Sequence, residues 1–569
     1  MFVWRYPKAF VDKLQSVEIK MLETKNIINT TIWHYSKDNF FKKEILFALH
    51  TLLNKYFVKY HLEQTLSKEP KFSINSDTFQ NIFSACHRKE KGIYYTPAEV
   101  VDYIVSNTII ANALNAECMF STDMALDTLL QMGQEFVQKL VFEKSFFDPT
   151  CGSGEFLLSV INLKIKLALK SELNLTDFDY IQICQSIKGN DIEDESIDIA
   201  KMRIFFAIAP YLKNPESFNE LAQTLNQCFF DKDFVLESSQ IQHKFDFIVG
   251  NPPYVEYAKY ERKREILNSY GNIYADVIAH SLTMLKQNGG LGFVLPLSYI
   301  STARMQKIRT LIKDNCDKQI ILSFADRPDC LFVGAHQKIN ILITKQGNKP
   351  CKTYTSNYKH WYKSERKFLL NGREIIATNI EYNEFIPKIG NEIELSIYNK
   401  IRSSHAHNLI SLQKQGGKGL YLNMRACFWI KAFSLSQNSK EYKTFYYDEN
   451  MRDFILCVLN SSLFWVYWSI VSDCWHLTQK ELQHFSVPQT IHNVKIYQKL
   501  AQKLETKLEK TKVYIKTAQT DYEYKHKLCK KEIDDIDNNL AEIYKLTPNE
   551  LKYIQNFALK YRMGDNAGV

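Results

Sequence analysis

The chain lacks clustered cysteines. Its 12 cysteines stand singly, without a Cys-x-x-Cys pair or a Cys/His group at metal-ligand spacing. Structural zinc sites need such groups, and disulfide-rich folds need cysteines in a closely spaced framework. The cysteine pattern therefore argues against a bound metal and indicates a reducing compartment.

Long apolar runs are also missing. The longest aromatic and apolar stretch covers residues 463–471, whereas a membrane-spanning helix needs roughly 20 such residues. The first seven residues, MFVWRYP, lack the basic-then-apolar layout of a secretory signal. We therefore expect a cytoplasmic protein with no membrane partner.

Charge of one sign dominates only near the C-terminus. The whole chain of 569 residues carries a modest formal charge of +9, but residues 495–532 hold 11 lysines against 5 acidic residues. Such a face is more often solvated than bound to DNA. A steep salt dependence of DNA affinity that disappears when these lysines are neutralised would identify a DNA contact.

Glycine is absent from residues 1–85, whose apolar residues recur at three- and four-residue spacing, so we expect helices there, one of them within 40–60. Residues 145–345 alternate between apolar strands and helices, which predicts an α/β fold with a doubly wound, mainly parallel, Rossmann-like sheet. The expected strands are 145–148, 187–190, 225–230, 245–249, 291–295, 320–324 and 338–344, and the expected helices are 155–170, 194–209, 274–286 and 302–313.

This rhythm ends at residue 345. We expect four parts: a helical N-terminal region (1–85), the α/β domain (86–345), a mixed α+β domain (346–490) and a C-terminal helical region (491–569). In the last part Thr547 and Glu550 form a predicted capping box.

The most informative motif is Asn251-Pro252-Pro253-Tyr254, which directly follows an apolar strand. In open α/β sheets, ligands bind at the carboxyl ends of the strands. The rigid turn offers an amide oxygen on Asn251, the carbonyl of Pro252 and the aromatic face of Tyr254. Two acceptors and a stacking surface suit a flat ligand that carries an amino or amide group.

A second motif joins the strand 145–148 to the helix 155–170. It contains Asp148, Thr150, Gly152 and Gly154, so the acid precedes the glycines. Glycines allow close backbone approach to a ligand at a helix N-terminus. The pattern differs from the dinucleotide fingerprint and favours a nucleoside with an amino-acid-like arm over a pyrophosphate, with a plain tight turn as the alternative.

A second carboxylate is expected at the end of the next strand, to accept hydrogen bonds from ribose hydroxyls. Asp191 has this position, with Glu193 as the substitute if the register slips, and a solvated acidic helix start as the alternative. Asp191 lies further from the loop than usual, which we ascribe to a loop between 171 and 182. Asp233, followed by Phe234, could accept a hydrogen bond from an adenine amino group, although a surface turn is equally compatible.

Upstream, Thr96, Pro97 and Glu99 predict a helix that starts with a capping box and ends near residue 113. Together these stretches resemble the S-adenosylmethionine-dependent N6-adenine DNA methyltransferases of restriction–modification systems. The resemblance covers residues 85–345 strongly and 390–560 weakly. It rests on 92–101, the glycine loop 148–156, the tetrapeptide 251–254, the strand 290–296 and the segment from Phe332.

The resemblance implies a site-specific DNA methyltransferase that uses S-adenosylmethionine and binds double-stranded DNA, with a cognate restriction endonuclease as a further partner. It assigns Asn251, Pro252 and Tyr254 to catalysis, and Asn251, Tyr254 and Phe332 to the target base, which is flipped from the duplex. The cofactor residues would be Tyr95, Thr96, Pro97, Asp148, Thr150, Gly152, Gly154, Asp191, Asp233 and Phe234.

The region 346–490 is the expected target-recognition domain. Its basic loop from Lys414 to Lys418 and the residues Arg425, Trp429 and Lys431 mix positive charge with aromatics, which suits DNA contact. The aromatic residues in the following stretch are expected in the core instead: Trp465, Tyr467, Trp468 and Trp475.

Three rival functions stay open. The same tetrapeptide occurs in enzymes that methylate RNA or protein glutamine. A bifunctional restriction–methylation enzyme would carry a nuclease before residue 90, where Glu18-Ile19-Lys20 has the form of a nuclease motif. A non-enzymatic specificity subunit would have kept the fold but would fail to bind S-adenosylmethionine.

Overall fold

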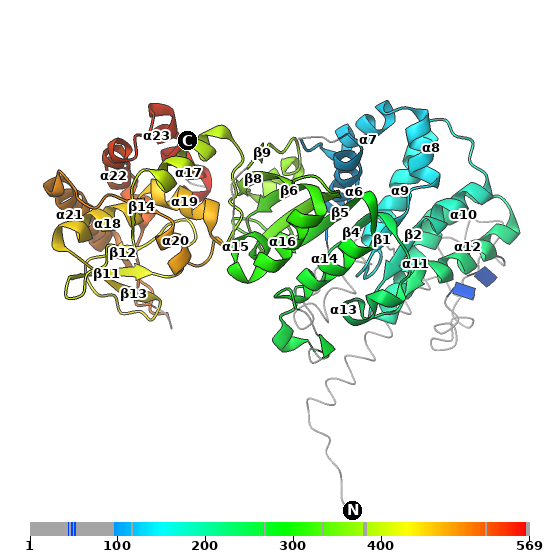
Figure 1. The fold of residues 1–569 in the computed structure, drawn as a ribbon, viewed down its shortest axis with the longest axis horizontal. Coiled ribbons are helices and arrows are strands. Elements are labelled where there is room, and N and C mark those ends of the chain that lie inside the picture. The colour runs from blue at the N-terminus through cyan, green and yellow to red at the C-terminus, as the bar shows by residue number, and fades with distance from the viewer. Residues whose placement is uncertain are drawn as a thin grey trace, which may run out of the picture.

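The computed structural model describes residues 44, 47–48, 51–52, 96–114, 118–260, 262, 265–266, 269–332, 335–378, 384–517 and 520–564. The expected helical region 1–85 therefore lies almost entirely outside the described residues. The five of its residues that are described are helical. The chain forms two lobes, a sheet lobe and a C-terminal lobe (Figure 1).

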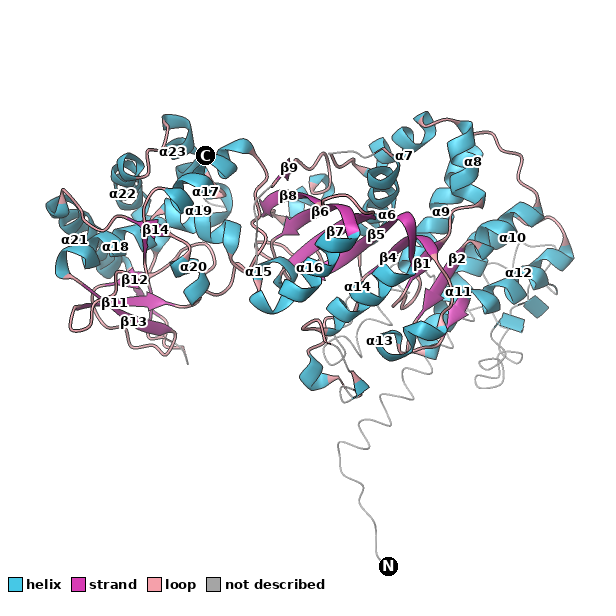
Figure 2. Ribbon diagram, in the orientation of Figure 1, coloured by secondary structure: helices cyan, strands magenta, loops and turns pink. Residues whose placement is uncertain are grey.

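The sheet lobe is built on one large mixed sheet (Figure 2). Among the described residues, nine strands pair in this order: β3 (Phe229–Phe230), β2 (Ile187–Asn190), β1 (Phe146–Asp148), β4 (Phe245–Gly250), β5 (Leu285–Pro296), β7 (Ile339–Gln346), β6 (Cys316–Phe324), β8 (Lys352–Lys359) and β9 (Ile376–Ala377). The first five strands in this order are parallel. The predicted doubly wound, mainly parallel α/β fold is confirmed.

Strand order reverses between β1 and β4, because the chain adds β2 and β3 on one side of β1 and then continues with β4 on the other. Ligands of open α/β sheets bind at such a switch point, beyond the carboxyl ends of the strands. The strands at this point are wholly buried, as expected for apolar runs in a parallel sheet.

Helices cover both faces of the sheet. They are α6 (Ala98–Ala113), α7 (Thr122–Gln131), α8 (Gln134–Phe142), α9 (Glu155–Lys170), α10 (Asp177–Gln185), α11 (Asp194–Ile208), α12 (Pro215–Cys228), α13 (Phe234–Glu237), α14 (Ile273–Met284), α15 (Ser298–Ser301) and α16 (Gln306–Asn315). In Figure 2, α14 and α16 lie over the face of the sheet turned to the viewer. Helix α9 packs against β1 and β2 and against α6.

Three sequence expectations differ from the structure. The expected strand 225–230 is mostly the end of α12, since Phe218, Leu221 and Leu225 form a helical apolar face, and only the last two residues pair as β3. The loop expected at 171–182 holds α10, which starts with a capping box at Thr176. β7 runs antiparallel to both β5 and β6. It does so because no described helix lies between β6 and β7 to carry a parallel crossover.

The C-terminal lobe is mixed α+β. Its helices are α17 (Glu392–Ser403), α18 (Glu449–Asn460), α19 (Ser462–Val471), α20 (Gln479–Gln483), α21 (Val494–Thr511), α22 (Lys530–Ile543), α23 (Pro548–Asn556) and α24 (Leu559–Met563). Its strands are β10 (His407–Asn408), β11 (Lys418–Asn423), β12 (Ala432–Phe433), β13 (Tyr442–Tyr447), β14 (Ser486–Val487), β15 (Val513–Tyr514) and β16 (Tyr522–Glu523).

The capping box of Thr547 and Glu550 forms as predicted, whereas β15 and β16 interrupt the region that we expected to be helical. No single helix among the described residues is long and apolar enough to cross a bilayer. Helices α18 and α19 meet the length and composition criteria only as a pair, which is bent by 64°. The expected domain limits stay a prediction, and the large sheet itself continues past residue 345 into β8 and β9.

Candidate active site

The glycine loop begins where β1 ends. The Thr150 N–H donates to Oδ1 of Asp148 over 3.0 Å. Gly154 has φ of 80°, and a Cβ there would lie 2.7 Å from the Cβ of Ala200 in α11. Only glycine fits this position, because both the backbone conformation and the packing exclude a side chain. The loop thereby brings the N-terminus of α9 to the carboxyl edge of the sheet.

Two carboxylates meet at this loop. Asp191 follows β2, and its Oδ2 accepts a hydrogen bond of 2.8 Å from the Gly152 N–H, while its Oδ1 accepts one of 3.0 Å from the Glu193 N–H. Burial raises the pKa of Asp148 well above its usual range, and the charge of Asp191 adds to this. Burial also raises the pKa of Asp191. A ligand that brings hydrogen-bond donors or positive charge would stabilise the ionised form of such buried carboxylates.

Asn190 is a contributor that the sequence analysis missed. Its buried amide donates to the carbonyls of Pro149 and Lys232, each over 3.0 Å, and its Oδ1 accepts from the Lys232 N–H over 3.2 Å. One side chain thus ties the loop after β1 to the loop after β3. Its role could have been predicted from its position, because it is a polar residue at the end of a buried strand.

Arg203 of α11 also forms hydrogen bonds with the glycine loop and with the first residue of α9. Its guanidinium donates to the Ser153 carbonyl over 2.8 Å and pairs with Glu155 over 2.5 Å. The sequence alone does not indicate this role, because charged residues are common on the exposed faces of amphipathic helices. Both contacts fix the position of the first residues of α9, so the loop is preorganised for a ligand.

The tetrapeptide lies next to this loop. β4 ends at Gly250, where a Cβ would lie 2.6 Å from Oδ1 of Asp148, so a side chain would collide with the carboxylate. The next residue, Asn251, donates from Nδ2 to Oγ1 of Thr96 over 3.1 Å. Thr96 is 4% exposed. The structure therefore brings together predicted residues from three distant stretches of the chain.

The capping box predicted at Thr96 is wrong. Helix α6 begins at Ala98 with Pro97 at the N-cap, and no side chain caps it. The Thr96 hydroxyl bonds Asn251 instead, and Glu99 pairs with Arg366 over 3.0 Å. Thr96 and Glu99 thus bond residues distant in the chain and not the backbone of the first turn of α6. Tyr95 lies outside the described residues.

Aromatic rings gather beside Asn251. The rings of Tyr254 and Phe332 lie 6.4 Å apart at 45°, and Tyr274 meets Tyr254 edge-on at 6.3 Å. Pro252, directly after Asn251, is buried. The structure thus places Phe332 beside the tetrapeptide, although β5 and β6 lie between them in the chain.

Asp233 and Phe234 have partners of their own. Asp233 caps α13 through the Val235 N–H, accepts a hydrogen bond from the Tyr260 hydroxyl and pairs with Arg262 over 3.4 Å. The Phe234 ring is buried and packs between those of Phe147 and His280, 5.8 and 6.2 Å away. Their role toward a cofactor stays a prediction.

A buried polar atom at the loop lacks a hydrogen-bond partner among the residues that the structure describes. Within the described part of the chain, Oγ1 of Thr150 makes no hydrogen bond. Burying an unpaired hydroxyl is unfavourable, and a polar ligand at the loop would satisfy it. The same described residues contain no group of three or more His, Cys, Asp or Glu side chains that could hold a metal ion.

Most cationic side chains named above for the expected target-recognition domain (346–490) form ion pairs or are buried. Three of them form ion pairs: Lys414 with Asp448 (2.8 Å), Lys418 with Glu449 (3.9 Å) and Arg425 with Glu441 (3.1 Å). Burial lowers the pKa of Lys431. The guanidinium of Arg562 lies over the ring of Trp429, 4.0 Å from the ring centroid.

The aromatic residues Trp465, Tyr467 and Trp468 are buried, which confirms their predicted place in the core. Trp475 differs, because it is only half-buried and lies between the lobes. Its indole faces Lys338 at 4.6 Å and Arg327 at 5.2 Å, both from the segment that leads to and from Phe332.

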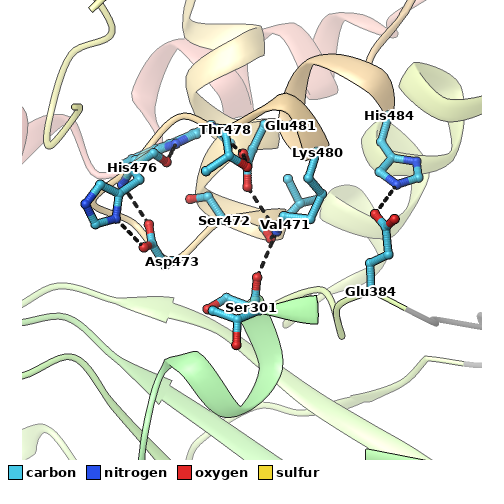
Figure 3. Close-up of polar contacts among 12 residues, drawn as sticks. Ser301, Glu384, Val471, Ser472, Asp473, His476, Thr478, Lys480, Glu481 and His484 are labelled. Carbon is cyan, nitrogen blue, oxygen red and sulfur yellow. Dashed lines mark hydrogen bonds and ion pairs between the residues drawn. The ribbon is translucent and has the colours of Figure 1, made fainter. Parts of the chain in front are cut away.

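The junction of the lobes is held by a lysine of α20. Lys480 donates to the carbonyl of Ser301 in the sheet lobe over 3.0 Å and to that of Val471 in the C-terminal lobe over 2.7 Å (Figure 3). It also pairs with Glu481 over 2.9 Å. These contacts join the C-terminal ends of α15 and α19, where carbonyls need donors.

Known proteins share parts of this sequence. Residues 185–330 match the Eco57I restriction-modification methylase model. The type II methyltransferase M.PaeR7I of Pseudomonas aeruginosa is 23% identical over 219 residues, which are 37% of this chain and 37% of that protein. The type II restriction enzyme and methyltransferase RM.Eco57I of Escherichia coli is 27% identical over 344 residues, 50% of this chain and 31% of that protein.

The matches span about two fifths of the length of the first curated relatives. Among solved structures, the type IIL restriction-modification enzyme MmeI in complex with DNA superposes with a TM-score of 0.47 at 13% identity, covering 89% of this chain and 84% of that one. The family model and the type II relatives together identify this chain as similar to the DNA methyltransferases of restriction–modification systems.

Proposed function

We propose that this protein transfers a methyl group from S-adenosylmethionine to the N6 amino group of an adenine in duplex DNA. One arrangement carries the proposal. The acceptor turn of Asn251 and Pro252 lies at the carboxyl edge of the sheet, directly beside Asp148 of the glycine loop. A group held by the turn and a cofactor held by the loop would therefore meet.

The residues of the loop fit the cofactor. Asp148 and Asp191 offer buried carboxylates to ribose hydroxyls and to positive charge, and Thr150 has a hydroxyl that lacks a partner among the described residues. Gly152 has open space where a Cβ would point. S-adenosylmethionine, when bound, supplies a methyl group that its positively charged sulfur makes electrophilic.

The tetrapeptide would hold the amino group. The Asn251 amide nitrogen is committed to Thr96, so the acceptor role falls to Oδ1, together with the Pro252 carbonyl. Both oxygens would accept the amino hydrogens and stabilise the positive charge that develops on the nitrogen. Tyr254 would stack on a base flipped from the duplex. Flipping costs a few kcal/mol, and stacking returns about 1–3 kcal/mol.

Transfer of labelled methyl groups from S-adenosylmethionine to duplex DNA tests the proposal, and single-molecule sequencing identifies the base and its context. Asn251→Ala should lower transfer at least about 100-fold, because it removes a transition-state acceptor. Its cofactor and DNA affinities should stay near those of the parent. Near-normal methylation by this variant, with both ligands bound, would contradict the assigned role.

The same assay distinguishes the alternatives. RNA and protein glutamine substrates are offered beside DNA, because their amino or amide groups suit the same acceptors. Cleavage of unmethylated DNA with Mg²⁺ is measured as well, since the relative RM.Eco57I is named as both a restriction enzyme and a methyltransferase. A cognate endonuclease, if one acts with this chain, should cleave only the unmethylated form of the sequence found.

A further inference from the structure

The C-terminal lobe carries an exposed two-stranded ribbon, β15 paired with β16, that the sequence analysis treated as helix. Its base is anchored. Tyr524, directly after β16, packs on Phe433 of β12 at 4.5 Å and donates to Glu509 of α21 over 3.0 Å. Asp521 accepts a hydrogen bond of 2.6 Å from Asn438, in the connection between β12 and β13. The ribbon thus adjoins the β11–β13 sheet.

The outer part of the ribbon is apolar and aromatic yet exposed. Tyr514 is 58% exposed and Val513 46%, and the Tyr514 and Tyr522 rings meet at 5.4 Å. Lys512 lies over the Tyr522 ring at 4.3 Å, which holds that ring in place. An ordered apolar surface without a cover marks an interaction site.

Positive charge surrounds this surface. Three exposed lysines flank it, Lys510, Lys516 and Lys527, and none of them forms an ion pair with any residue that the structure describes. The cations of the basic loop 414–418 differ, because Asp448 and Glu449 stand beside them. Carboxylates stand at the ribbon as well, but Glu509 and Glu523 pair with Lys512 and Lys525. Lys510, Lys516 and Lys527 therefore add positive charge beyond these pairs.

We propose that the ribbon formed by β15 and β16 contacts duplex DNA, as a part of the DNA-binding surface outside the expected reader 346–490. The inference rests on the proposed function. An antiparallel two-stranded ribbon fits the major groove, and lysines at its flanks reach the phosphates on either side. A second copy of this chain fits less well, because it would bring the same lysines against each other.

The test compares two variants with equal loss of charge. Lys510, Lys516 and Lys527 are changed together to Gln. The matched control changes Lys166, Lys170 and Lys213, exposed lysines of which two end α9 at the far edge of the sheet. A third variant, Tyr514→Ser, removes the exposed ring and keeps the charge. Binding of a 30-base-pair duplex is measured by fluorescence anisotropy across a salt series.

The ribbon variant should bind about 10- to 100-fold more weakly, and its plot of log affinity against log salt should lose about 2 to 3 units of slope, one per lost phosphate contact. Tyr514→Ser should weaken binding with the slope kept. The control should stay within about twofold of the parent. Equal effects of the two lysine variants would overturn the inference, as would a changed sedimentation coefficient of the ribbon variant with unchanged DNA affinity.

Cofactor binding separates this result from the larger proposal. The two ribbon variants should bind S-adenosylmethionine in calorimetry as the parent does, because the ribbon lies in the other lobe. A parent chain that neither binds the cofactor nor methylates duplex DNA would refute the proposed function. A parent chain that does both, while the ribbon variant matches the control, would refute only the role of the ribbon.

Discussion

Single side chains at the switch point serve two elements at once. Thr96 precedes α6, yet its hydroxyl bonds the amide of Asn251 after β4. Asn190 ends β2 and holds the loops after β1 and β3. The positions of Asp148, Asp191 and Asn251 at strand ends could be predicted from sequence. Asp148 and Asn251 each come at the end of an apolar run, and Asp191 directly follows the next predicted strand. The bonds between them could not, because they depend on which strands become neighbours.

Replacing Thr96 tests whether it positions Asn251. Thr96→Val keeps the shape but loses the acceptor for the amide nitrogen, so Asn251 can rotate about its last side-chain bond. We expect kcat to fall about 10-fold or more with little change in KM for DNA, since a catalytic group placed loosely loses rate rather than affinity.

Thr96→Ser is the matched control, because it keeps the hydroxyl, and it should restore most of kcat. If the valine variant instead raised KM for S-adenosylmethionine and left kcat intact, Thr96 would be a cofactor contact and not a positioning residue.

Elements of the sheet lobe followed from the sequence where the apolar pattern was local. The helix 155–170 was predicted with its observed limits as α9, and β2 likewise. The antiparallel β7 and the helix α10 were missed. Direction within a sheet depends on the connection between strands, and α10 is stabilised by packing on α12 more than by its own weak apolar pattern.

A buried lysine in α9 makes stability depend on pH. Lys164 is 1% exposed, and its ammonium donates to the carbonyls of Val141 and Lys144 and to the hydroxyl of Ser186. Burial lowers its pKa to about 7. The unfolded chain, where the pKa is near the usual 10.5, therefore binds one more proton between these values, and the free energy of unfolding rises with pH across that window.

We expect this lysine to add about 2 kcal/mol to the stability of the sheet lobe between pH 7 and pH 9. Denaturant unfolding of the parent and of Lys164→Met at both pH values isolates the effect. The methionine variant should lack this rise even if its stability at pH 7 is changed by the lost hydrogen bonds. An equal pH dependence in the two proteins would show that the lysine is protonated when folded.

At the scale of the whole molecule, the two lobes are joined by hydrogen bonds to helix ends. The backbone of Ile386 bonds that of Ile300 over 2.8 Å, and the buried Lys388, whose pKa burial lowers to about 8, donates to the carbonyls of Ile470 and Ser472. Lys480 completes the junction from α20. The angle between the lobes is therefore set by these contacts.

Lys480→Met keeps the aliphatic stem and removes the donors that join α15 to α19. Each carbonyl left without a partner costs about 1–3 kcal/mol where it stays buried. The variant should be cleaved faster by protease near the described residues 384–391 and should bind DNA more weakly, while its affinity for S-adenosylmethionine stays unchanged. Unaltered proteolysis and DNA binding would mean that the remaining contacts suffice to hold the lobes.

The bond between Thr96 and Asn251 spans 155 positions of the chain. On the ribosome, the glycine loop, Asp191 and their strands all emerge before Asn251 does, so the residues that we propose to hold the cofactor are synthesised first. Contacts of long sequence separation close late in folding. A truncated chain that stops ahead of β4 would therefore lack Asn251 and also the strand that pairs with β1 beside Asp148. Under the proposed function, such an unfinished chain has no acceptor turn for a substrate.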